Sequence, residues 1–276
     1  MQPDAAMREL TMPATDLPEA ASAPPRNPFR RARGVDYVEY LAALHNRYLF
    51  EWYLEIGCRN GRSFAPVRGK TIAVDPFFKV RHNVIGPKPA LHVFQQTSDD
   101  FFASGFLARN DIRLSFSFLD GMHLFEYLLR DFFNVERASD PRGAIAIHDC
   151  CPFSHAMTIR DHTLIPPRSA WTGDVWKLIP ILQEYRPELK ISALDCHPTG
   201  LVLVSNLQPG NDILPQHYDE IVARYMDVTL ESWGVQRFND SFTFVKSALI
   251  TSRSKTVLDK VALGKEDLHI PTPVSL

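Results

Sequence analysis

The chain lacks several features that would assign it to a specialised class of protein. It has only four cysteines among 276 residues, Cys58, Cys150, Cys151 and Cys196, and their spacing matches no zinc-binding motif. Adjacent cysteines such as Cys150 and Cys151 rarely bond to each other, so no disulfide framework is indicated. The apolar runs stay far below the ~20 residues of a membrane-spanning helix, and no signal-peptide pattern precedes them. We therefore expect a cytoplasmic protein.

The chain also lacks an excess of charge of either sign. Its 30 basic and 32 acidic residues leave a formal charge of -2. Such a balance gives no global field that would attract nucleic acid or an anionic bilayer. We therefore expect neither a nucleic-acid nor a membrane partner, and a small-molecule substrate is favoured. The hydrophobic fraction of 45% is sufficient for one full-sized core.

Three segments of the chain differ in composition. Residues 1–33 are rich in alanine and proline without sustained periodicity, which is typical of a disordered leader. Residues 34–210 hold the apolar runs of a folded domain. Residues 211–276 form a C-terminal extension with a predicted helix at His217–Met226, a strand or edge segment at Ser241–Val245 and a tail. This extension could cover the active site or form the interface of a homo-oligomer, and both possibilities stay open.

The central segment begins with a predicted amphipathic helix and continues with seven predicted strands. Apolar residues recur at helical spacing from Tyr37 to Tyr48. The predicted strands, each followed by a stretch that could be helical, are Trp52–Ile56, Thr71–Val74, Leu91–Gln95, Ser115–Leu119, Ala144–Ile147, Leu189–Leu194 and Leu201–Val204. Continuous apolar runs of this length are typical of a parallel sheet that is covered on both faces. We predict an α/β fold, a Rossmann-like seven-stranded, mostly parallel sheet with helices on both faces.

Two glycines follow the first predicted strand. The strand carries Glu55, and the turn after it reads Glu-x-Gly-x-x-x-Gly, with Gly57 and Gly61, before Ser63. Glycines at such a turn let the backbone approach a ligand, and open α/β sheets bind ligands at this edge. The spacing differs from the Gly-x-Gly-x-x-Gly of dinucleotide-binding proteins. It resembles the first motif of class I S-adenosylmethionine-dependent methyltransferases.

The resemblance extends to the next two strand ends. Asp75 ends the second strand, where an acid can accept both hydroxyls of a ribose. Ser98 and Asp99 follow the third strand, where the family places polar groups against adenine, and Asp99 is favoured. The resemblance implies S-adenosylmethionine as cofactor, bound by Glu55, Gly57, Gly61, Ser63, Asp75, Ser98, Asp99 and Asp120. Any one motif alone fits turn glycines and a helix-capping aspartate better, but three in chain order favour the cofactor site.

Acids and histidines follow the fourth and fifth strands. Residues 120–123 read Asp-Gly-Met-His, and residues 148–149 read His-Asp. This pair resembles the branch of the family that contains macrolide-sugar and aminocoumarin-sugar O-methyltransferases and cephalosporin-biosynthesis methyltransferases. The resemblance implies O-methylation of a saccharide or a glycosylated small molecule with the help of a divalent cation, Mg²⁺ first. His148 stands where many relatives have an acid, which leaves the identity and presence of the metal open.

These residue types suit methyl transfer to a hydroxyl. The displacement needs a deprotonated and positioned oxygen, and a divalent cation lowers the pKa of a coordinated hydroxyl. Asp120, His148 and Asp149 are the candidate metal ligands. His123 is the candidate general base, because its ordinary pKa is near neutral. The simpler alternative is that Asp120 caps the following helix and that His123 is a polar residue of its first turn.

Three further residues are candidates for contacts with the acceptor. Asp174 and Trp176 lie in a Gly-Asp-Val-Trp-Lys sequence similar to one found among polysaccharide-tailoring methyltransferases. An aromatic face and a carboxylate suit a sugar, although a helix cap for Asp174 and a core position for Trp176 are equally compatible. His155 lies in a polar segment, residues 152–168, that is typical of a mobile loop over the site.

Two other functions remain compatible with the sequence. One is a metal-independent methyltransferase that acts on an amine or a phenol. The other is a cofactor-binding module that has lost catalysis, for which the departure from the family pattern at His148 is the motivating feature.

Overall fold

The computed structural model describes residues 28–252, so most of the expected leader and the C-terminal tail lie outside the described residues. Seven strands form one sheet in the order β3-β2-β1-β4-β5-β7-β6. They are β1 (Trp52–Ile56), β2 (Lys70–Val74), β3 (Leu91–Phe94), β4 (Leu114–Leu119), β5 (Ser139–His148), β6 (Lys190–Leu194) and β7 (Leu201–Ser205). Strands β1 to β5 pair in parallel, and β7 is antiparallel to both β5 and β6. The predicted fold class is confirmed, because this is the Rossmann-like sheet of the class I methyltransferase fold.

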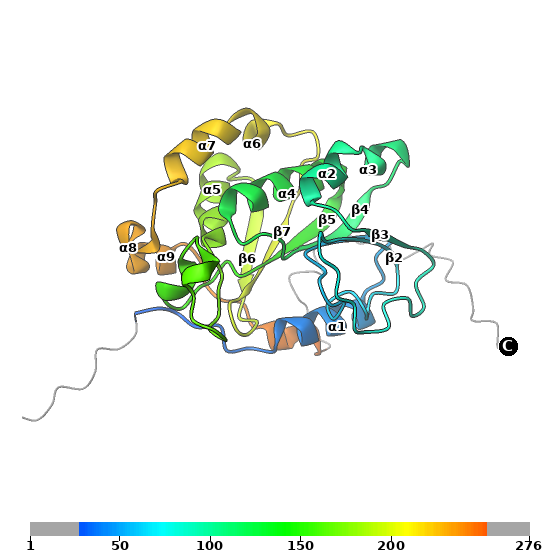
Figure 1. Cartoon of the computed structure of the whole chain (residues 1–276), viewed down its shortest axis with the longest axis horizontal. Coiled ribbons are helices and arrows are strands. Elements are labelled where there is room, and N and C mark those ends of the chain that lie inside the picture. The colour runs from blue at the N-terminus through cyan, green and yellow to red at the C-terminus, as the bar shows by residue number, and fades with distance from the viewer. Residues whose placement is uncertain (1–27, 253–276) are drawn as a thin grey trace, which may run out of the picture.

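Helices cover both faces of the sheet (Figure 1). They are α1 (Tyr37–Arg47), α2 (Ser98–Ala103), α3 (Phe106–Arg109), α4 (Phe125–Ala138), α5 (Leu178–Tyr185), α6 (Ile213–Gln216), α7 (Tyr218–Tyr225), α8 (Leu230–Trp233) and α9 (Val235–Asp240). Short 3₁₀ turns lie at Ala156–Thr158, His162–Leu164, Val175–Lys177 and Ser247–Ile250. Helix α1 covers one face, whereas α4 and α5 cover the other. Of the helices described, none has both the length and the hydropathy that a bilayer crossing requires.

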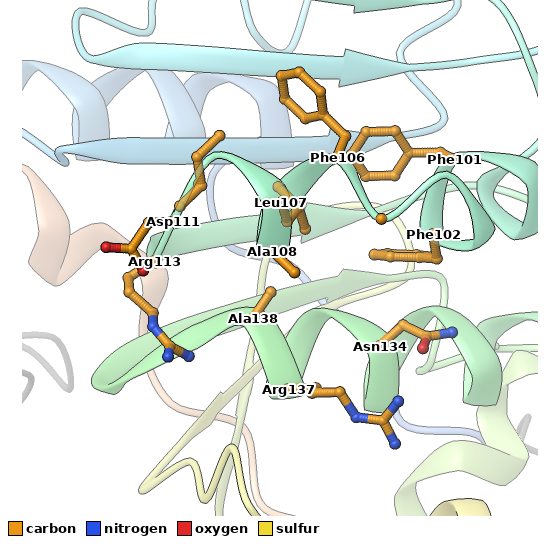
Figure 2. A pocket seen from close by; sticks show the side chains of 12 residues that line it. Phe101, Phe102, Phe106, Leu107, Ala108, Asp111, Arg113, Asn134, Arg137 and Ala138 are labelled. Atoms are coloured by element: carbon orange, nitrogen blue, oxygen red, sulfur yellow. The ribbon is translucent and has the colours of Figure 1, made fainter.

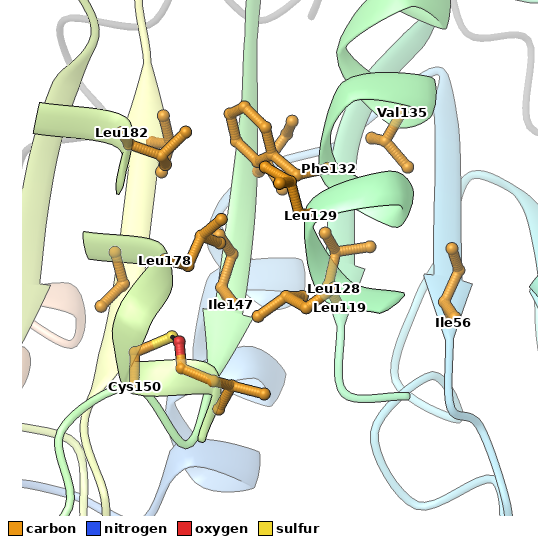
Figure 3. Packing of buried hydrophobic residues seen from close by; sticks show 14 of the residues in the cluster. Ile56, Leu119, Leu128, Leu129, Phe132, Val135, Ile147, Cys150, Leu178 and Leu182 are labelled. Atoms are coloured by element: carbon orange, nitrogen blue, oxygen red, sulfur yellow. Dashed lines mark hydrogen bonds between the residues drawn. The ribbon is translucent and has the colours of Figure 1, made fainter. Parts of the chain in front are cut away.

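The two faces of the sheet have separate cores because successive strand residues point to opposite sides. On β4, Phe118 packs in the core under α1, and the next residue, Leu119, packs in the core under α4. Helix α4 contributes buried residues at helical spacing, including Leu129 and Phe132. Figure 3 shows these side chains pointing from α4 toward the sheet, beside Leu178 of α5.

The expectation of a helical stretch after every strand is wrong after β1, β2 and β6, and only a short turn, residues 195–200, joins β6 to β7. Residues 57–69 after β1 and residues 75–90 after β2 form turns and irregular loops. Three glycines and a proline interrupt the first segment, and three prolines and a glycine interrupt the second, which disfavours helix continuation. The Ser241–Val245 segment also forms no strand and makes one isolated bridge, between Leu194 and Val245. Both long loops lie at the end of the sheet where the candidate site residues are found.

A buried ion pair joins α4 to the end of α5. Arg186 is fully buried, and its Nη1 and Nη2 donate to Glu136 at 2.6 and 2.9 Å. We expect Glu136→Gln to lower the free energy of unfolding by ~3 kcal/mol, because the buried Arg186 loses a bidentate partner and keeps only Glu188 at 2.5 Å. The matched control is Asp212→Asn at the Arg137–Asp212 pair, whose side chains are more than half exposed and where we expect a loss below ~1 kcal/mol. Urea denaturation of both variants checks this, and equal losses would contradict it.

Candidate active site

The glycine turn after β1 lies directly against the end of β4. Gly57 has a φ of 88°, and a Cβ at this position would stand 1.9 Å from the carbonyl oxygen of Asp120. Its N–H donates to the carbonyl of Val74, the last residue of β2. Gly61 has a φ of 83°, and a Cβ there would meet Val84 at 2.5 Å. Both predicted glycines therefore occupy positions that exclude a side chain, and the turn touches β2 and β4 together.

A hydrogen bond between Glu55 and Ser63 stabilises this turn. Glu55 is fully buried, and its carboxylate accepts hydrogen bonds from the hydroxyls of Ser63 and Tyr53, both at 2.5 Å. Burial raises the pKa of Glu55 to about 7, against the opposing effect of these two hydrogen bonds. The contact joins the strand to the far end of the turn. Glu55 and Ser63 therefore help to hold the loop in place.

Asp75 is held by backbone groups at the end of β2. Its carboxylate accepts from the N–H of Arg59 at 2.8 Å and from the N–H of Phe77 at 2.6 Å. Each oxygen therefore receives one bond, and a carboxylate can accept about four. The geometry leaves acceptor capacity for the hydroxyls of a ribose beside the glycine turn.

Ser98 and Asp99 begin α2 and have different partners. The Asp99 carboxylate accepts from Arg130 of α4 at 2.8 and 2.6 Å, with one bond to each oxygen. The Ser98 hydroxyl bonds to Asp131 of α4. Arg130 also contacts the hydroxyl of Tyr218. The residue favoured for adenine, Asp99, is thus engaged with α4.

Asp131 gives the site a testable pH dependence. The side chain is buried, its Oδ1 atom has no hydrogen-bond partner, and burial raises its pKa to about 7. The folded state therefore keeps a proton that the unfolded chain releases near pH 4, so stability falls as the pH rises from about 4 to about 7. Asparagine does not titrate, so we expect the free energy of unfolding of Asp131→Asn, relative to that of the wild type, to rise by about 2 to 3 kcal/mol from pH 5 to pH 8. Urea titrations at both pH values measure this, and a difference independent of pH would contradict it.

The acids and histidines after β4 and β5 meet at one point. Asp120 Oδ1 lies 3.2 Å from Nδ1 of His148 and 3.5 Å from Nε2 of His123. Asp149 Oδ2 lies 3.3 Å from Nε2 of His123, and its Oδ1 lies 3.4 Å from Nδ1 of His148. One ligand atom from each of Asp120, His123 and Asp149 falls within 4.8 Å of the others. The four residues predicted for catalysis and metal binding thus lie together, here called the acid–histidine cluster, but the group that could hold a metal contains His123 in place of the predicted ligand His148.

The electrostatics of the acid–histidine cluster are those of two carboxylates facing two imidazoles. Burial lowers the pKa of His148, but Asp149 and Asp120 outweigh it and raise this pKa to about 10. Burial also lowers the pKa of His123, but hydrogen bonding to Asp120 and the charge of Asp149 outweigh it and raise this pKa above the ordinary value. Burial raises the pKa of Asp120, but His148 and His123 hold it well below its usual range. The cluster therefore favours positive charge between the two carboxylates.

His123 is oriented by residues that the sequence interpretation did not include. Its Nδ1 lies 2.9 Å from the carbonyl oxygen of Trp171, and the imidazole stacks on the indole at 4.9 Å. A hydrogen bond to a carbonyl keeps the proton on Nδ1, so Nε2 faces the carboxylates. Helix α4 begins after His123, at Phe125, and Asp120 does not cap it. The simpler alternative of a capping Asp120 is thus not what the structure shows.

Two more neighbours of the acid–histidine cluster come from distant parts of the chain. Thr199 donates its hydroxyl proton to Asp149 at 2.5 Å, and the ring of Tyr37 in α1 stacks on His148 at 3.8 Å. Tyr37 was identified only as part of an amphipathic helix. No local motif marks Thr199, because its role depends on the pairing of β5 and β7.

The three residues predicted for the acceptor line a separate cavity of about 330 Å³. Asp174 is buried, and its carboxylate accepts from the N–H of Phe125 at the start of α4 and pairs with Arg160 and Lys177. Trp176 is 1% exposed and packs with α8 and α9. His155 pairs with Glu231 at 3.1 Å. Asp174 and Trp176 therefore have structural partners, as the alternative interpretation had it, although Asp174 caps α4 and not its own helix.

A further cavity, of about 350 Å³, lies at the opposite end of the strands (Figure 2). It is bordered by α2, α3 and the C-terminal half of α4. Figure 2 shows Phe101 and Phe106 on one side, with Arg113 and Arg137 on the other. It contains none of the predicted site residues.

Comparisons with known proteins give likeness at the level of structure alone. No protein-family model matches the chain, and no curated protein matches it. A cofactor-bound structure of Rv0187 from MTB is 13% identical with a TM-score of 0.47, over 63% of this chain and 80% of that one. The O-methyltransferase TomG from Streptomyces achromogenes, in complex with SAM, is 16% identical with a TM-score of 0.41, over 69% and 83%.

A third similar structure is the MycE methyltransferase of the mycinamycin biosynthetic pathway, in complex with Mg, SAH and mycinamycin VI. It is 14% identical with a TM-score of 0.40, over 63% of this chain and 49% of that one. Because these identities and TM-scores are low, the fold assignment rests on the strand order and not on these superpositions. The chain has the class I methyltransferase fold, with the glycine turn and the acid–histidine cluster at the carboxyl end of its parallel strands.

Proposed function

We propose that the protein is an S-adenosylmethionine-dependent methyltransferase that transfers the methyl group to a hydroxyl. The observation that carries this proposal is the contact between the glycine turn and the end of β4, where the Gly57 Cα faces the Asp120 carbonyl at a distance that excludes a Cβ. Asp120 is both a neighbour of the turn and a member of the acid–histidine cluster. A cofactor bound at the turn would therefore lie next to groups that can hold and deprotonate an acceptor.

The residues at and beside the glycine turn fit this donor. S-Adenosylmethionine supplies a methyl group on a sulfonium, which an acceptor oxygen displaces in line. Asp75 keeps acceptor capacity for ribose hydroxyls, and the exclusion of side chains at Gly57 and Gly61 lets a ligand approach the backbone. Ser98 and Asp99 at the start of α2 are both proposed for the contact with adenine, because Asp99 receives only one hydrogen bond from Arg130 on each oxygen.

The acid–histidine cluster fits a divalent cation. Asp120 and Asp149 supply oxygen ligands, which suit Mg²⁺ or Mn²⁺. Such a cation supplies positive charge that lowers the pKa of a coordinated hydroxyl. His123, with its proton held on Nδ1 by Trp171, directs Nε2 toward the two carboxylates, where it would accept the proton of an acceptor hydroxyl bound beside them. His148 hydrogen-bonds to Asp120 and orients it.

The proposed acceptor is a saccharide or a glycosylated small molecule. Support comes from the aromatic surface beside His123, where Trp171 stacks on the imidazole and His162 lies 5.5 Å from the indole. Aromatic faces pack well on the C–H faces of sugars.

A second candidate function is methyl transfer without a metal. It is favoured by one observation, namely that the imidazole nitrogens of His148 and His123 lie 3.2 to 3.5 Å from the oxygens of Asp120 and Asp149, where a cation would otherwise be held. Both candidates use the same proposed cofactor site, so the dependence of turnover on a cation separates them.

One acceptor screen tests these proposals. The protein is incubated with S-adenosylmethionine and a panel of saccharides, phenols and amines, with Mg²⁺, with Mn²⁺ or after chelation, and S-adenosylhomocysteine release is measured. Turnover of a saccharide that chelation abolishes supports the first candidate. Turnover that survives thorough chelation supports the second. Cofactor binding without turnover of any acceptor would contradict both and indicate a binding module.

A further inference from the structure

The charge of the chain is unevenly distributed around the glycine turn. Residues 57–98 contain seven Lys or Arg residues and a single acid, Asp75, whereas the whole chain has a formal charge of -2. The expectation that no membrane or nucleic acid would be attracted was based on the net charge of the whole chain, which hides the positive charge of this segment. A local excess of one sign can attract an oppositely charged surface even when the total charge is close to zero.

Four of these basic side chains are exposed on one surface. Arg59 and Arg62 lie on the glycine turn, and Lys79 and Arg81 lie on the loop after β2. The loop is attached to the turn by two backbone hydrogen bonds, from Lys79 N–H to Arg59 at 2.7 Å and from Arg81 N–H to Asn60 at 3.0 Å. We call these four residues the basic rim. The two segments therefore form one continuous surface.

The basic rim has few acidic neighbours. Within residues 28–252, no ion pair joins Arg59, Lys79 or Arg81 to a carboxylate, and Arg62 approaches Asp36 only to 3.9 Å. The remaining cations of the segment are engaged elsewhere. They are Arg68, which donates to two backbone carbonyls, Lys70, which pairs with Glu51, and Lys88, which donates to Ala65. The positive charge of the basic rim is thus available to a partner.

Exposed apolar side chains alternate with these cations. Phe77 is 75% exposed, Ile85 is 67% exposed and Val80 is 45% exposed. Among the described residues, Phe77 is the most exposed large apolar side chain. Exposed apolar side chains gathered on one loop beside cations are typical of a surface that contacts a protein or a membrane.

We propose that the basic rim, together with Phe77, Val80 and Ile85, docks on an anionic lipid bilayer. Lipid headgroups attract the cations, and the interface accepts the aromatic and aliphatic side chains, so one surface uses both kinds of residue. A soluble polyanion such as a nucleic acid would use the charges and gain little from Val80 and Ile85. The docking does not depend on the proposed activity. It turns the edge that holds Asp75 toward the bilayer, where a lipid-linked acceptor would be presented.

Sedimentation of the full-length protein with lipid vesicles tests this proposal. We expect binding to vesicles of phosphatidylcholine mixed with phosphatidylglycerol, little binding to phosphatidylcholine alone, and weakening by salt. The double variants Lys79→Glu/Arg81→Glu and Phe77→Ser/Ile85→Ser should each reduce binding about tenfold or more. The matched controls Arg109→Glu/Arg137→Glu and Leu164→Ser/Ile213→Ser change exposed residues elsewhere and should bind as the wild type does.

Two results would overturn the proposal. One is a wild-type protein that does not sediment with the mixed vesicles at low salt. The other is binding that charge reversal removes but Phe77→Ser/Ile85→Ser leaves unchanged, because this pattern shows that the apolar side chains take no part in the docking. Circular dichroism of each variant separates loss of docking from loss of folding. S-Adenosylmethionine binding by the same variants separates failure of the docking proposal from failure of the proposed function.

Discussion

Gly57→Ala is expected to abolish binding of S-adenosylmethionine and to lower the free energy of unfolding by more than the ~1 to 3 kcal/mol that backbone strain alone costs. The positive φ of Gly57 accounts for the strain, and the Asp120 carbonyl 1.9 Å from the new Cβ adds a collision with backbone that cannot rotate away. Relief of this collision has to move the turn or the end of β4. Both movements alter the proposed cofactor crevice.

Gly234 provides a matched control for this variant. Its φ of 90° is close to that of Gly57, but a Cβ there would meet nothing within 4 Å. Gly234→Ala should therefore lose stability through backbone strain alone and bind the cofactor as the wild type does. Urea denaturation and calorimetric titration of both variants separate strain from collision. Equal losses of stability with intact binding in both would show that the contact of the turn with β4 has no role.

His123→Ala is expected to lower turnover by about 10²- to 10⁴-fold, the usual contribution of a general base. Cofactor affinity should change little, because His123 contacts Asp120, Asp149 and Trp171 and not the glycine turn. The measurement is the initial rate with the acceptor that the screen identifies, together with the dissociation constant of S-adenosylmethionine.

His155→Ala is the control for this second prediction. His155 is partly exposed and pairs with Glu231, away from the acid–histidine cluster. We expect a rate close to that of the wild type. A loss of turnover in His155→Ala as large as in His123→Ala, or unchanged turnover in His123→Ala, would remove His123 from the role of base.

The sequence predicted the sheet well because buried parallel strands are continuous apolar runs. Trp52–Ile56 matches β1 residue for residue, and the other strands end within two residues of their predicted C-termini. The acid–histidine cluster was predicted for a related reason. Asp120 and Asp149 follow neighbouring parallel strands, whose carboxyl ends meet at one edge of the sheet. Residues that follow such strands can be placed together without knowledge of the loops.

Partners that come from distant elements could not be predicted. The engagement of Asp99 depends on Arg130 reaching across from α4, and the cap that Asp174 gives to α4 joins residues almost fifty positions apart. Side chains of this kind are placed by tertiary packing, for which a local pattern contains no signal. The same holds for Thr199, which reaches Asp149 only because β7 returns antiparallel to β5.

The most direct test of the central claim is calorimetric titration with S-adenosylmethionine and S-adenosylhomocysteine of the wild-type protein and Asp75→Ala. The account predicts saturable binding of both ligands by the wild type and loss of binding in the variant, because the Asp75 carboxylate is the proposed acceptor for the ribose hydroxyls beside the glycine turn. No binding by the wild type, with or without Mg²⁺, would contradict the account and leave a methyltransferase fold that serves another purpose.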